Sequence, residues 1–443
     1  MNKKVLFVSL GCDKNLVDTE VMLGLLQNAG FELTYEEAEA DVIVVNTCCF
    51  IGDAKEESIN TILEMAAWKE RGRCQALVVT GCLAQRYREE VLTEMPEVDA
   101  VLGTTSYEEI VRVITGLLSG EKHTQVFRDI NALPQNGGER ILTTGGHYAF
   151  LKIAEGCDKR CTYCVIPSVR GNYRSVPMEQ LILEARLLAA KGVKELILIA
   201  QETTLYGVDL YGHKALPELL ARLSEIPGIF WIRLQYCYPE EITEELIAAI
   251  RDLPKVCHYL DIPIQHASDR VLRRMGRRTT REDITGIIRH LREEIPDIAL
   301  RTTLITGFPG ESEEDFAQLM DFVDEMEFDR LGVFPYSQEE GTPAAAMPDQ
   351  IPEEVKLTRR DEVMELQQDI AFAAAEDLVG RELTVMVEGY LSDGDVYAAR
   401  TYRDSPNVDG YLFLPSEENL MTGDLVRVRV TGAAEYDLLG EII

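Results

Sequence analysis

The stretch EGCDKRCTYCVIPSVRG, from Glu155 to Gly171, follows an apolar segment with the character of a β-strand. It places Cys157, Cys161 and Cys164 in a C-x3-C-x2-C array inside one loop. Three thiolates in one loop can bind three irons of a four-iron cube and leave the fourth iron without a protein ligand. Because an open metal position allows a substrate to chelate, the array predicts a catalytic iron–sulfur cluster.

Two other uses of such cysteines fit the spacing less well. A zinc knuckle normally needs a fourth Cys or His at a fixed offset, and none follows Cys164 closely. The ferredoxin run has C-x2-C-x2-C spacing, which is one residue shorter between its first two cysteines. The array therefore favours a cluster with one open iron.

On both sides of this array the chain alternates strand-like and helix-like segments, which indicates an α/β protein. Before the array, β-branched runs separated by amphipathic stretches predict a parallel α/β sheet. The runs are VLFVSL, VIVVN and ALVVT, with helices expected from about Leu16 and about Asp53. Pro, Gly and Asn gather between Asn131 and Gly146, which predicts a linker. We therefore expect an N-terminal domain over residues 1–142.

A second series of segments follows. Its six strand candidates predict a partial (β/α)6 barrel over residues 143–375 rather than eight closing strands: FLKIAE, ELILIAQ, WIRLQY, HYLDIPI, IALRTTLITG and RLGVFPYS. Residues from Pro352 to about Asp377 predict a long helix leading away from this barrel. Four short alternating strands then predict a small all-β barrel over residues 376–443: LTVMVEGY, VYAARTY, GYLFL and DLVRVRVTG. Three domains agree with a length of 443 residues, which exceeds what one hydrophobic core usually fills.

Composition limits where the protein works and what it binds. No apolar run is long enough to span a membrane, and the start MNKKVLFVSLGC fits a first strand better than a signal peptide. Ten cysteines without a secretory signal indicate thiolate ligands in a reducing cytoplasm rather than disulfides. The formal charge of −32 makes nucleic acid a poor default partner, although solubility alone also explains such acidity. We therefore expect a cytoplasmic protein.

Three further cysteines share one structural position. Cys12 follows VLFVSLG, Cys48 follows VIVVNT and Cys82 follows ALVVTG. The carboxyl ends of neighbouring parallel strands converge where open α/β sheets bind ligands. The alternative is that all three are small buried hydrophobes, as free cysteines often are, but the repeated placement favours a second cluster. We interpret the remaining cysteines as packing residues, one of them beside a predicted ligand: Cys49, Cys74, Cys237 and Cys257.

With Tyr163 before its last cysteine, the array resembles the C-x3-C-x-aromatic-C signature of the radical S-adenosylmethionine enzymes. In that family the amino and carboxylate groups of S-adenosylmethionine chelate the open iron. An electron from the cluster then cleaves the sulfonium bond and gives methionine and a 5′-deoxyadenosyl radical. The resemblance implies the partial barrel, with Cys157, Cys161 and Cys164 as catalytic cluster ligands and Tyr163 beside the cofactor.

Polar groups and glycines at the strand ends of this barrel are the candidates for holding S-adenosylmethionine. Glu202 and Gln265 are expected at such ends, and Arg301 is expected on the strand that enters TTLITGFPGE. Gly307 and Gly310 of that motif either allow close backbone approach to the adenosyl group or form an ordinary strand-to-helix turn.

A three-cysteine N-terminal domain, a radical barrel and a small β-barrel together resemble the methylthiotransferases over essentially the whole chain. In that family the N-terminal cluster carries the sulfur that is methylated and inserted, and the terminal TRAM domain grips a macromolecular substrate. The resemblance therefore implies two [4Fe-4S] clusters, one on each cysteine triad. It also implies two molecules of S-adenosylmethionine per product, one as methyl donor and one as radical source.

The family divides between enzymes that act on an adenosine beside a tRNA anticodon and a branch that acts on an aspartate β-carbon of ribosomal protein S-twelve. Three motifs are similar to the second branch: SLGCDKNLVDTE (Ser9–Glu20), AQETTLYG (Ala200–Gly207) and YLDIPIQHAS (Tyr259–Ser268). The tRNA branch typically has GCQMN and GQNVN at the first two places. Asp13 departs from the proline usual in the second branch and affects the loop beside Cys12, not the ligand itself.

Charge gives a separate test of the partner. From Glu376 to the end there are 14 Asp and Glu residues against five Arg and no Lys. A domain that grips tRNA should be basic, whereas an acidic one complements a basic ribosomal protein, free or within the small subunit. The alternative explanation of this charge is a solvated surface without a partner. The alternative functions of the chain are an RNA methylthiotransferase and a non-catalytic iron–sulfur protein. The radical chemistry implies a low-potential electron donor such as flavodoxin or ferredoxin.

Overall fold

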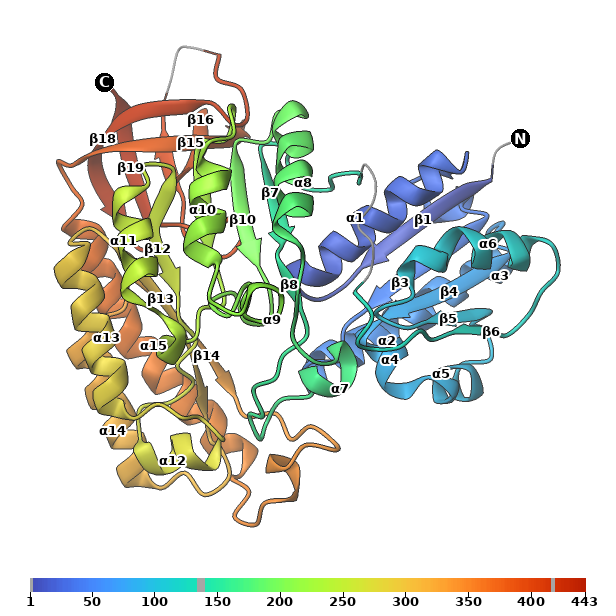
Figure 1. Ribbon diagram of the computed structural model, residues 1–443, viewed down its shortest axis with the longest axis horizontal. Helices are drawn as coiled ribbons and strands as arrows, with labels where there is room; N and C mark the ends of the chain where they lie inside the picture. Colours follow the sequence, from blue (N-terminus) through green and yellow to red (C-terminus); the bar gives the residue numbers. More distant parts are fainter. Residues whose placement is uncertain (1–2, 134–139, 416–418) are drawn as a thin grey trace. The chain divides into compact units, whose positions relative to one another are not determined.

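The computed structural model describes residues 3–133, 140–415 and 419–443 (Figure 1). The chain forms two compact units, and each unit draws on separate stretches of sequence. Unit 1 comprises residues 1–143, 152–176 and 337–345, and unit 2 comprises residues 144–151, 177–336 and 346–443. Residues 134–139 of the predicted linker lie outside the described residues, and its described remainder carries no helix or strand. The domain boundaries after residues 142 and 375 stay predictions.

Unit 1 is built on a parallel sheet of six strands in the order β2-β1-β3-β4-β5-β6. The three runs predicted as strands form the neighbouring β1, β3 and β4, so that expectation is confirmed. The other strands are two or three residues long, too short to show a periodicity. The strands are β1 (Lys4–Ser9), β2 (Glu32–Leu33), β3 (Val42–Thr47), β4 (Ala76–Gly81), β5 (Ala100–Leu102) and β6 (Thr124–Val126).

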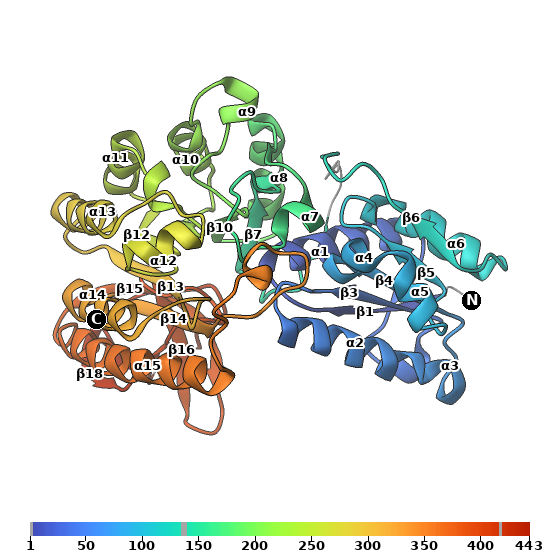
Figure 2. The same ribbon diagram turned by 90° about the horizontal axis from the view of Figure 1, so that it is seen from below.

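Helices cover both faces of this sheet, which is why β3 and β4 are buried along their whole length. Met22 and Ile110, from α1 and α6, pack on one face, and Ile62 and Leu83, from α2 and α4, pack on the other. Figure 2 shows α6 and α2 on opposite sides of the sheet. The helices are α1 (Asp13–Asn28), α2 (Gly52–Ala66), α3 (Trp68–Arg71), α4 (Cys82–Tyr87), α5 (Glu89–Glu94) and α6 (Ile110–Leu118).

The second stretch of unit 1 is a loop-rich segment around the C-x3-C-x2-C array. It begins with β8 (Ala154–Glu155), continues through the array into the short helix α7 (Ile166–Arg170), and returns in β9 (Arg174–Ser175). β8 and β9 pair antiparallel, Ala154 opposite Ser175. The array is therefore held at both ends by one small hairpin-like pair.

Unit 2 contains the six predicted β/α strands in the order β14-β13-β12-β11-β10-β7 (Figure 1). Because the order does not return from β14 to β7, the sheet is open, and the expected partial barrel is confirmed. The strands are β7 (Tyr148–Lys152), whose last residue belongs to unit 1, β10 (Glu195–Ile199), β11 (Trp231–Leu234), β12 (Val256–Asp261), β13 (Ala299–Thr306) and β14 (Arg330–Pro335).

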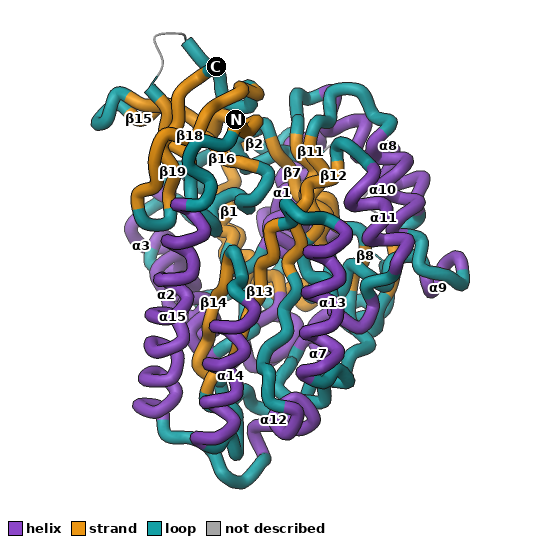
Figure 3. The backbone as a smooth tube through the Cα atoms, turned by 90° about the vertical axis from the view of Figure 1, so that its left-hand side faces the viewer, coloured by secondary structure: helices purple, strands orange, loops and turns teal. Residues whose placement is uncertain are grey.

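Helices follow these strands in turn. The predicted long helix is confirmed as α15 (Figure 3), but its predicted course away from the barrel is wrong, because it packs against β14, β13 and α14. The helices of unit 2 are α8 (Met178–Ala190), α9 (Val208–Tyr211), α10 (Leu216–Ser224), α11 (Glu244–Asp252), α12 (Asp269–Arg274), α13 (Arg281–Glu294), α14 (Glu313–Met326) and α15 (Glu353–Glu376). In the part of the chain that the structure describes, no helix combines the length and apolarity needed to cross a membrane.

The C-terminal strands close into a barrel in the order β15-β16-β17-β19-β18, as predicted. This barrel packs on the amino-terminal ends of the β/α strands, where Trp231, Cys257 and Ala299 contact Met386. Its strands are β15 (Glu382–Leu391), β16 (Val396–Thr401), β17 (Leu412–Leu414), β18 (Leu425–Ala434) and β19 (Asp437–Ile442), the last of which the sequence pattern does not predict.

Buried ion pairs reinforce the same contact. Glu195, at the start of β10, lies 2.7 Å from Nε of Arg233 and 2.6 Å from Nη2 of Arg400, and all three side chains have no exposed surface. Arg400 comes from the C-terminal barrel. The small barrel therefore closes the amino-terminal end of the open sheet within unit 2.

Candidate functional site: two cysteine triads in unit 1

Sheet register brings the three strand-end cysteines together. Thr47 pairs with Gly81, so Cys48 and Cys82 leave neighbouring strands side by side. Ser9 pairs with Asn46, and Cys12 follows three residues later as the cap of α1. The predicted placement of this N-terminal triad, Cys12, Cys48 and Cys82, at adjacent strand ends is confirmed.

A glycine makes this close approach possible. Gly11 has φ +87°, and a Cβ atom there would lie 2.6 Å from Cβ and 2.9 Å from Sγ of Cys48. No side chain fits in that space or favours that backbone conformation. The chain therefore turns sharply at Gly11, and α1 begins at Asp13 rather than near Leu16.

Asn15, on the first turn of α1, ties these strand ends to one another. Its Nδ2 donates to the carbonyl of Leu10 at 3.0 Å and to the carbonyl of Thr47 at 2.9 Å. Asn46 donates to the backbone carbonyl of Asn15 at 2.9 Å. The thiol of Cys82 points at Oδ1 of Asn15 over 3.8 Å. One buried amide thus fixes the ends of β1 and β3 relative to Cys82.

Burial and a nearby cation act in opposite directions on these thiols. Burial raises the pKa of Cys48 and of Cys82, and the guanidinium of Arg170 pulls both pKa values down in part. A negative charge on Cys12 or Cys48 raises the pKa of Cys82 further, so the three sulfurs lie within electrostatic reach of one another. Because metals bind thiolates and release the protons, the triad has the chemistry of a ligand set with one cation facing it.

The second triad, Cys157, Cys161 and Cys164, lies in the loop between β8 and α7. The amide of Cys157 donates to Gly171 O at 3.1 Å, and the amide of Cys164 donates to Cys161 O at 3.1 Å. Burial raises the pKa of Cys164 to about 12, and the amide of Ile166, 3.5 Å from its sulfur, lowers it in part. A negative charge on Cys157 or Cys161 raises the pKa of Cys164 further, so the three sulfurs of this loop lie within electrostatic reach of one another.

Both triads fit a cluster better than a single ion. Over residues 3–133, 140–415 and 419–443, no three His, Cys, Asp or Glu side chains converge closely enough to hold one metal ion. A four-iron cube places each thiolate on a different iron, so its ligands surround a cluster and do not meet at one point. The three cysteines of each triad lie within electrostatic reach of one another, and Cys49 also lies within reach of Cys82. This grouping of thiols suits such an arrangement.

A buried charge network joins the two triads. Arg170, the last residue of α7, donates from Nη1 to Asp18 of α1 at 2.8 Å and to Glu155 at 3.3 Å. Lys152 also pairs with both carboxylates, with 2.8 Å to Glu155. Nη2 of Arg170 donates to Oδ1 of Asn15. The segment that carries the second triad is therefore bound, through Arg170, to the residue that organises the first.

A third stretch of unit 1, Ser337–Ala345, makes a separate connection. Ser337 accepts from the amide of Gly52 at 3.1 Å, four residues after Cys48, and the amide of Ala344 donates to Thr162 O at 2.9 Å, beside Cys161. The sequence alone predicts neither this segment nor Arg170 as part of the site. Strand-end cysteines are a local signal, whereas these contacts join residues far apart in the sequence.

Of the remaining cysteines, Cys49 follows Cys48 directly and lies within electrostatic reach of Cys82. All four are buried, as expected of packing residues: Cys49, Cys74, Cys237 and Cys257. Cys49 and Cys74 belong to the apolar core of unit 1. Burial raises the pKa of Cys49 to about 11, and the guanidinium of Arg86 lowers it in part.

The predicted cofactor-binding side chains of unit 2 occupy different parts of the open sheet. Glu202, fully buried after β10, accepts from the amide of Thr204 at 3.0 Å. Gln265 has φ +73° after β12, and its backbone pairs with Thr303 and Ile305 of β13. Their role toward S-adenosylmethionine stays a prediction, as does that of Tyr163 in the cysteine loop.

Arg301 and Gly307 lie at opposite parts of β13. Arg301 is its third residue, and its Nε lies 3.7 Å from Asp409 of the C-terminal barrel. Gly307 follows the last residue of the strand with φ +69°, and a Cβ there would lie 2.2 Å from Cγ of Lys356. Gly307 thus allows close packing with α15, and Gly310, with φ +77°, lies against Arg274 in the same way. The role of Arg301 and Gly307 toward the cofactor also stays a prediction.

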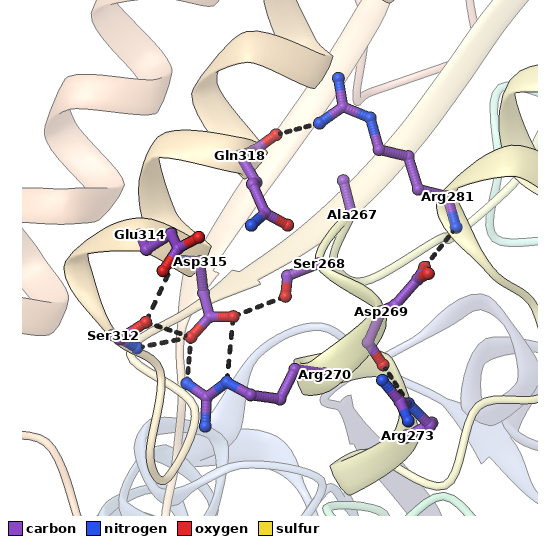
Figure 4. A pocket seen from close by; sticks show the side chains of 10 residues that line it. All are labelled: Ala267, Ser268, Asp269, Arg270, Arg273, Arg281, Ser312, Glu314, Asp315 and Gln318. Atoms are coloured by element: carbon purple, nitrogen blue, oxygen red, sulfur yellow. Dashed lines mark hydrogen bonds and ion pairs between the residues drawn. The ribbon is translucent and has the colours of Figure 1, made fainter.

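A cavity of about 300 Å³ opens elsewhere in unit 2, among α12, α13 and α14 (Figure 4). Arg270 lines it and pairs with Asp315, which also accepts from Ser268 at 2.6 Å. None of the predicted site residues lines it. It is lined by no cysteine, so we do not assign it to the chemistry of the cysteines.

Three family profiles match successive stretches of the chain. Residues 4–103 match the Uncharacterized protein family UPF0004, residues 151–323 match the Radical SAM superfamily, and residues 379–443 match the TRAM domain. The first stretch contains the N-terminal triad, and the second contains the C-x3-C-x2-C array.

Curated relatives match over the full length. The "Ribosomal protein uS12 methylthiotransferase RimO" of Lachnoclostridium phytofermentans is 63% identical over 437 residues, which is 99% of each chain. The protein of the same name from Acetivibrio thermocellus is 54% identical over 449 residues, covering 100% of this chain and 99% of its own. Together with the fold and the triads, these matches define the class, a radical S-adenosylmethionine methylthiotransferase that uses an iron–sulfur cluster. Within that class, the chain belongs to the RimO family.

Solved structures agree on the fold. The radical S-adenosylmethionine methyltransferase TsrM from Kitasatospora setae, solved with cobalamin and a [4Fe-4S] cluster, has a TM-score of 0.56 to this chain at 15% identity. The similarity covers 78% of this chain and 77% of that one. At such identity the match supports the arrangement of strands and helices and carries nothing about the substrate.

Proposed function

We propose that this chain transfers a methylthio group to the β-carbon of an aspartate in ribosomal protein uS12. The names of relatives at 63% and 54% identity support this substrate. The motifs Ser9–Glu20, Ala200–Gly207 and Tyr259–Ser268 support the same branch of the family.

Two [4Fe-4S] clusters are part of the proposal. The observation that carries it is the presence of both cysteine triads in one compact unit, joined through Arg170 and Asn15. A group carried by one cluster must meet a substrate radical formed beside the other, so a fixed relation between the two ligand sets is what methylthio transfer requires.

The residues take distinct parts in this scheme. Cys157, Cys161 and Cys164 would hold a cluster with one open iron, and the N-terminal triad would hold the second cluster. Bound there, the clusters and S-adenosylmethionine supply the electron, the radical and the sulfur chemistry. The protein contributes position and a dry environment, since five of the six cysteines are buried or half-buried. The proposed contacts of S-adenosylmethionine remain Tyr163, Glu202, Gln265, Arg301 and Gly307.

The acidic C-terminal barrel supports a basic protein as substrate. Four of its five arginines already pair with carboxylates: Arg400, Arg403, Arg427 and Arg429. Few cations are therefore left to bind a phosphate backbone, while the acidic surface attracts a protein rich in Lys and Arg. We propose that the enzyme works in the cytoplasm with a low-potential donor such as flavodoxin or ferredoxin, on uS12 alone or within the small ribosomal subunit.

One experiment tests substrate and chemistry together. Reduced, reconstituted enzyme is offered uS12, the small ribosomal subunit and tRNA with S-adenosylmethionine, and each is searched by mass spectrometry for a methylthio adduct. We expect the adduct on an aspartate of uS12. An adduct on tRNA alone would overturn the substrate. The C161A and C48A variants should give no adduct, whereas C74A, which alters a buried packing cysteine of the same unit, should keep it.

A further inference from the structure

Arg170 occupies an unusual environment for an arginine. Its side chain is 2% exposed and lies among three other buried charges, Asp18, Glu155 and Lys152. Two cations and two anions balance, so the network is neutral by itself. An ion-pair network of this kind is costly to desolvate and is weak evidence for stability alone.

The two terminal nitrogens of Arg170 contact different parts of the site. While Nη1 contacts the carboxylates, Nη2 donates to Oδ1 of Asn15. That oxygen lies 3.8 Å from Sγ of Cys82, and the amide nitrogen of Asn15 holds the carbonyls of Leu10 and Thr47. These carbonyls lie beside Cys12 and Cys48 in the sequence. One guanidinium therefore faces the carboxylate network on one side and the N-terminal triad on the other.

Cys12 is exposed but Cys48 and Cys82 are buried, and buried thiolates need a nearby positive charge. Inside a protein the interaction between charges is stronger than in water, and an uncompensated buried charge is costly. The geometry places such a charge there, because Nη2 of Arg170 donates to Oδ1 of Asn15, and that oxygen lies 3.8 Å from Sγ of Cys82. Lys152 donates to the same two carboxylates, whereas Arg170 has a second amine, Nη2, that donates to Oδ1 of Asn15 on the side of the N-terminal triad.

We propose that Arg170 is a positioning residue for the N-terminal triad: it holds Asn15 in place and supplies the fixed positive charge beside which Cys12, Cys48 and Cys82 bind their cluster. The inference rests on the proposed second cluster. Arg170 lies six residues after Cys164, so the segment that carries the radical triad also sets the electrostatics of the other. A fixed cation stabilises the reduced, more negative state of a cluster and so raises its reduction potential.

The test isolates the N-terminal cluster. In a parent with Cys157, Cys161 and Cys164 all replaced by Ala, iron and sulfide per chain are measured after anaerobic reconstitution, and the midpoint potential is measured by a redox titration followed by EPR. R170M should lower the potential and reduce the iron retained. R170K keeps a charge and should stay near the parent. D18N removes a negative charge from the same network and should raise the potential.

The opposite signs separate electrostatics from structure. A merely structural network would be damaged alike by R170M and D18N, with no change of potential or a shift in the same direction. The matched control is R140M, because Arg140 is equally buried and pairs with Glu20 further along α1; it should leave the potential unchanged. If R170M does not fold, the D18N and R170K potentials decide, and a D18N value equal to that of the parent overturns the inference.

The same preparation distinguishes this inference from the proposed function. A parent without iron would refute the second cluster and the role of Arg170 with it. Iron in the parent, together with an unchanged potential in R170M, would refute the role of Arg170 alone and leave the proposed function standing.

Discussion

Replacing Arg400 with Met should destabilise unit 2 strongly. Arg400 has no exposed side-chain surface and lies 2.6 Å from Glu195 and 2.6 Å from Glu388, and it donates to the carbonyl of Asp404 at 2.9 Å. R400M leaves these buried acceptors without that partner. Removing one member of a buried ion pair typically costs about 3–5 kcal/mol, and we expect a loss of that size in the free energy of unfolding.

The two tryptophans of the chain provide the assay. Trp231 begins β11 and packs beside Met386 of the C-terminal barrel, whereas Trp68 lies in unit 1. In a W68F background, urea unfolding followed by tryptophan fluorescence therefore reports on the junction that Arg400 supports. The matched control is R427M, since Arg427 pairs with Glu382 on the surface, with side chains 67% and 42% exposed. Such a pair contributes about 0–1 kcal/mol.

The ion pair between Arg400 and Glu195 also predicts the direction in which R400M shifts acid unfolding. Burial raises the pKa of Glu195, but Arg400 and Arg233 lower it further, so it lies below the ordinary glutamate value. The stabilisation is therefore present above the ordinary pKa and is lost as the pH falls through the lowered one. R400M should move acid unfolding to higher pH. The reasoning is refuted if R400M and R427M lose the same small amount, under about 1 kcal/mol.

Three other changes have definite expected outcomes. C161A should abolish 5′-deoxyadenosine formation while the N-terminal triad keeps its iron; continued cleavage would rule out Cys161 as a ligand. G11A should lower iron binding at that triad and should lower the free energy of unfolding by about 1–3 kcal/mol, because its Cβ would lie 2.6 Å from Cβ of Cys48 at φ +87°. G30A is the control, since a Cβ at Gly30 contacts nothing. Equal iron binding in both variants would contradict the steric argument. The hydrogen bond to Glu244 raises the pKa of His290, so the contribution of this pair to stability is complete below the ordinary histidine pKa and is lost as the pH rises through the raised one. An NMR titration should find the pKa of His290 lowered in E244Q. An unchanged pKa would refute the pairing.

Local patterns in the sequence predict the longer strands, and they predict that Cys12, Cys48 and Cys82 lie at the ends of neighbouring strands. β3 and β4 read as continuous β-branched runs because helices bury both of their faces. The cysteines then follow from where those runs end, since register alone brings Cys48 beside Cys82.

Contacts between distant segments cannot be read in the same way. The pairing of Arg170 with Asp18 joins residues 152 positions apart, and each residue alone looks like an ordinary surface charge. The sequence does not predict β19 because its alternation of apolar and polar residues is short and is interrupted by Gly440. Arg301 sits near the beginning of β13 and faces Asp409, a partner that only tertiary packing supplies. What the sequence lacks in each case is the identity of the neighbouring segment.

The composition of unit 1 has a consequence for how the chain is assembled during synthesis. Its sheet is encoded before residue 127, but the unit also takes in residues 152–176 and 337–345. During synthesis the three cysteines of the N-terminal triad therefore leave the ribosome before Arg170, and Ser337 follows only when most of the chain has been made. A fragment ending near residue 142 would keep all three cysteines and lack the guanidinium that faces them. Loading of the proposed second cluster is thus expected late, on a nearly complete chain.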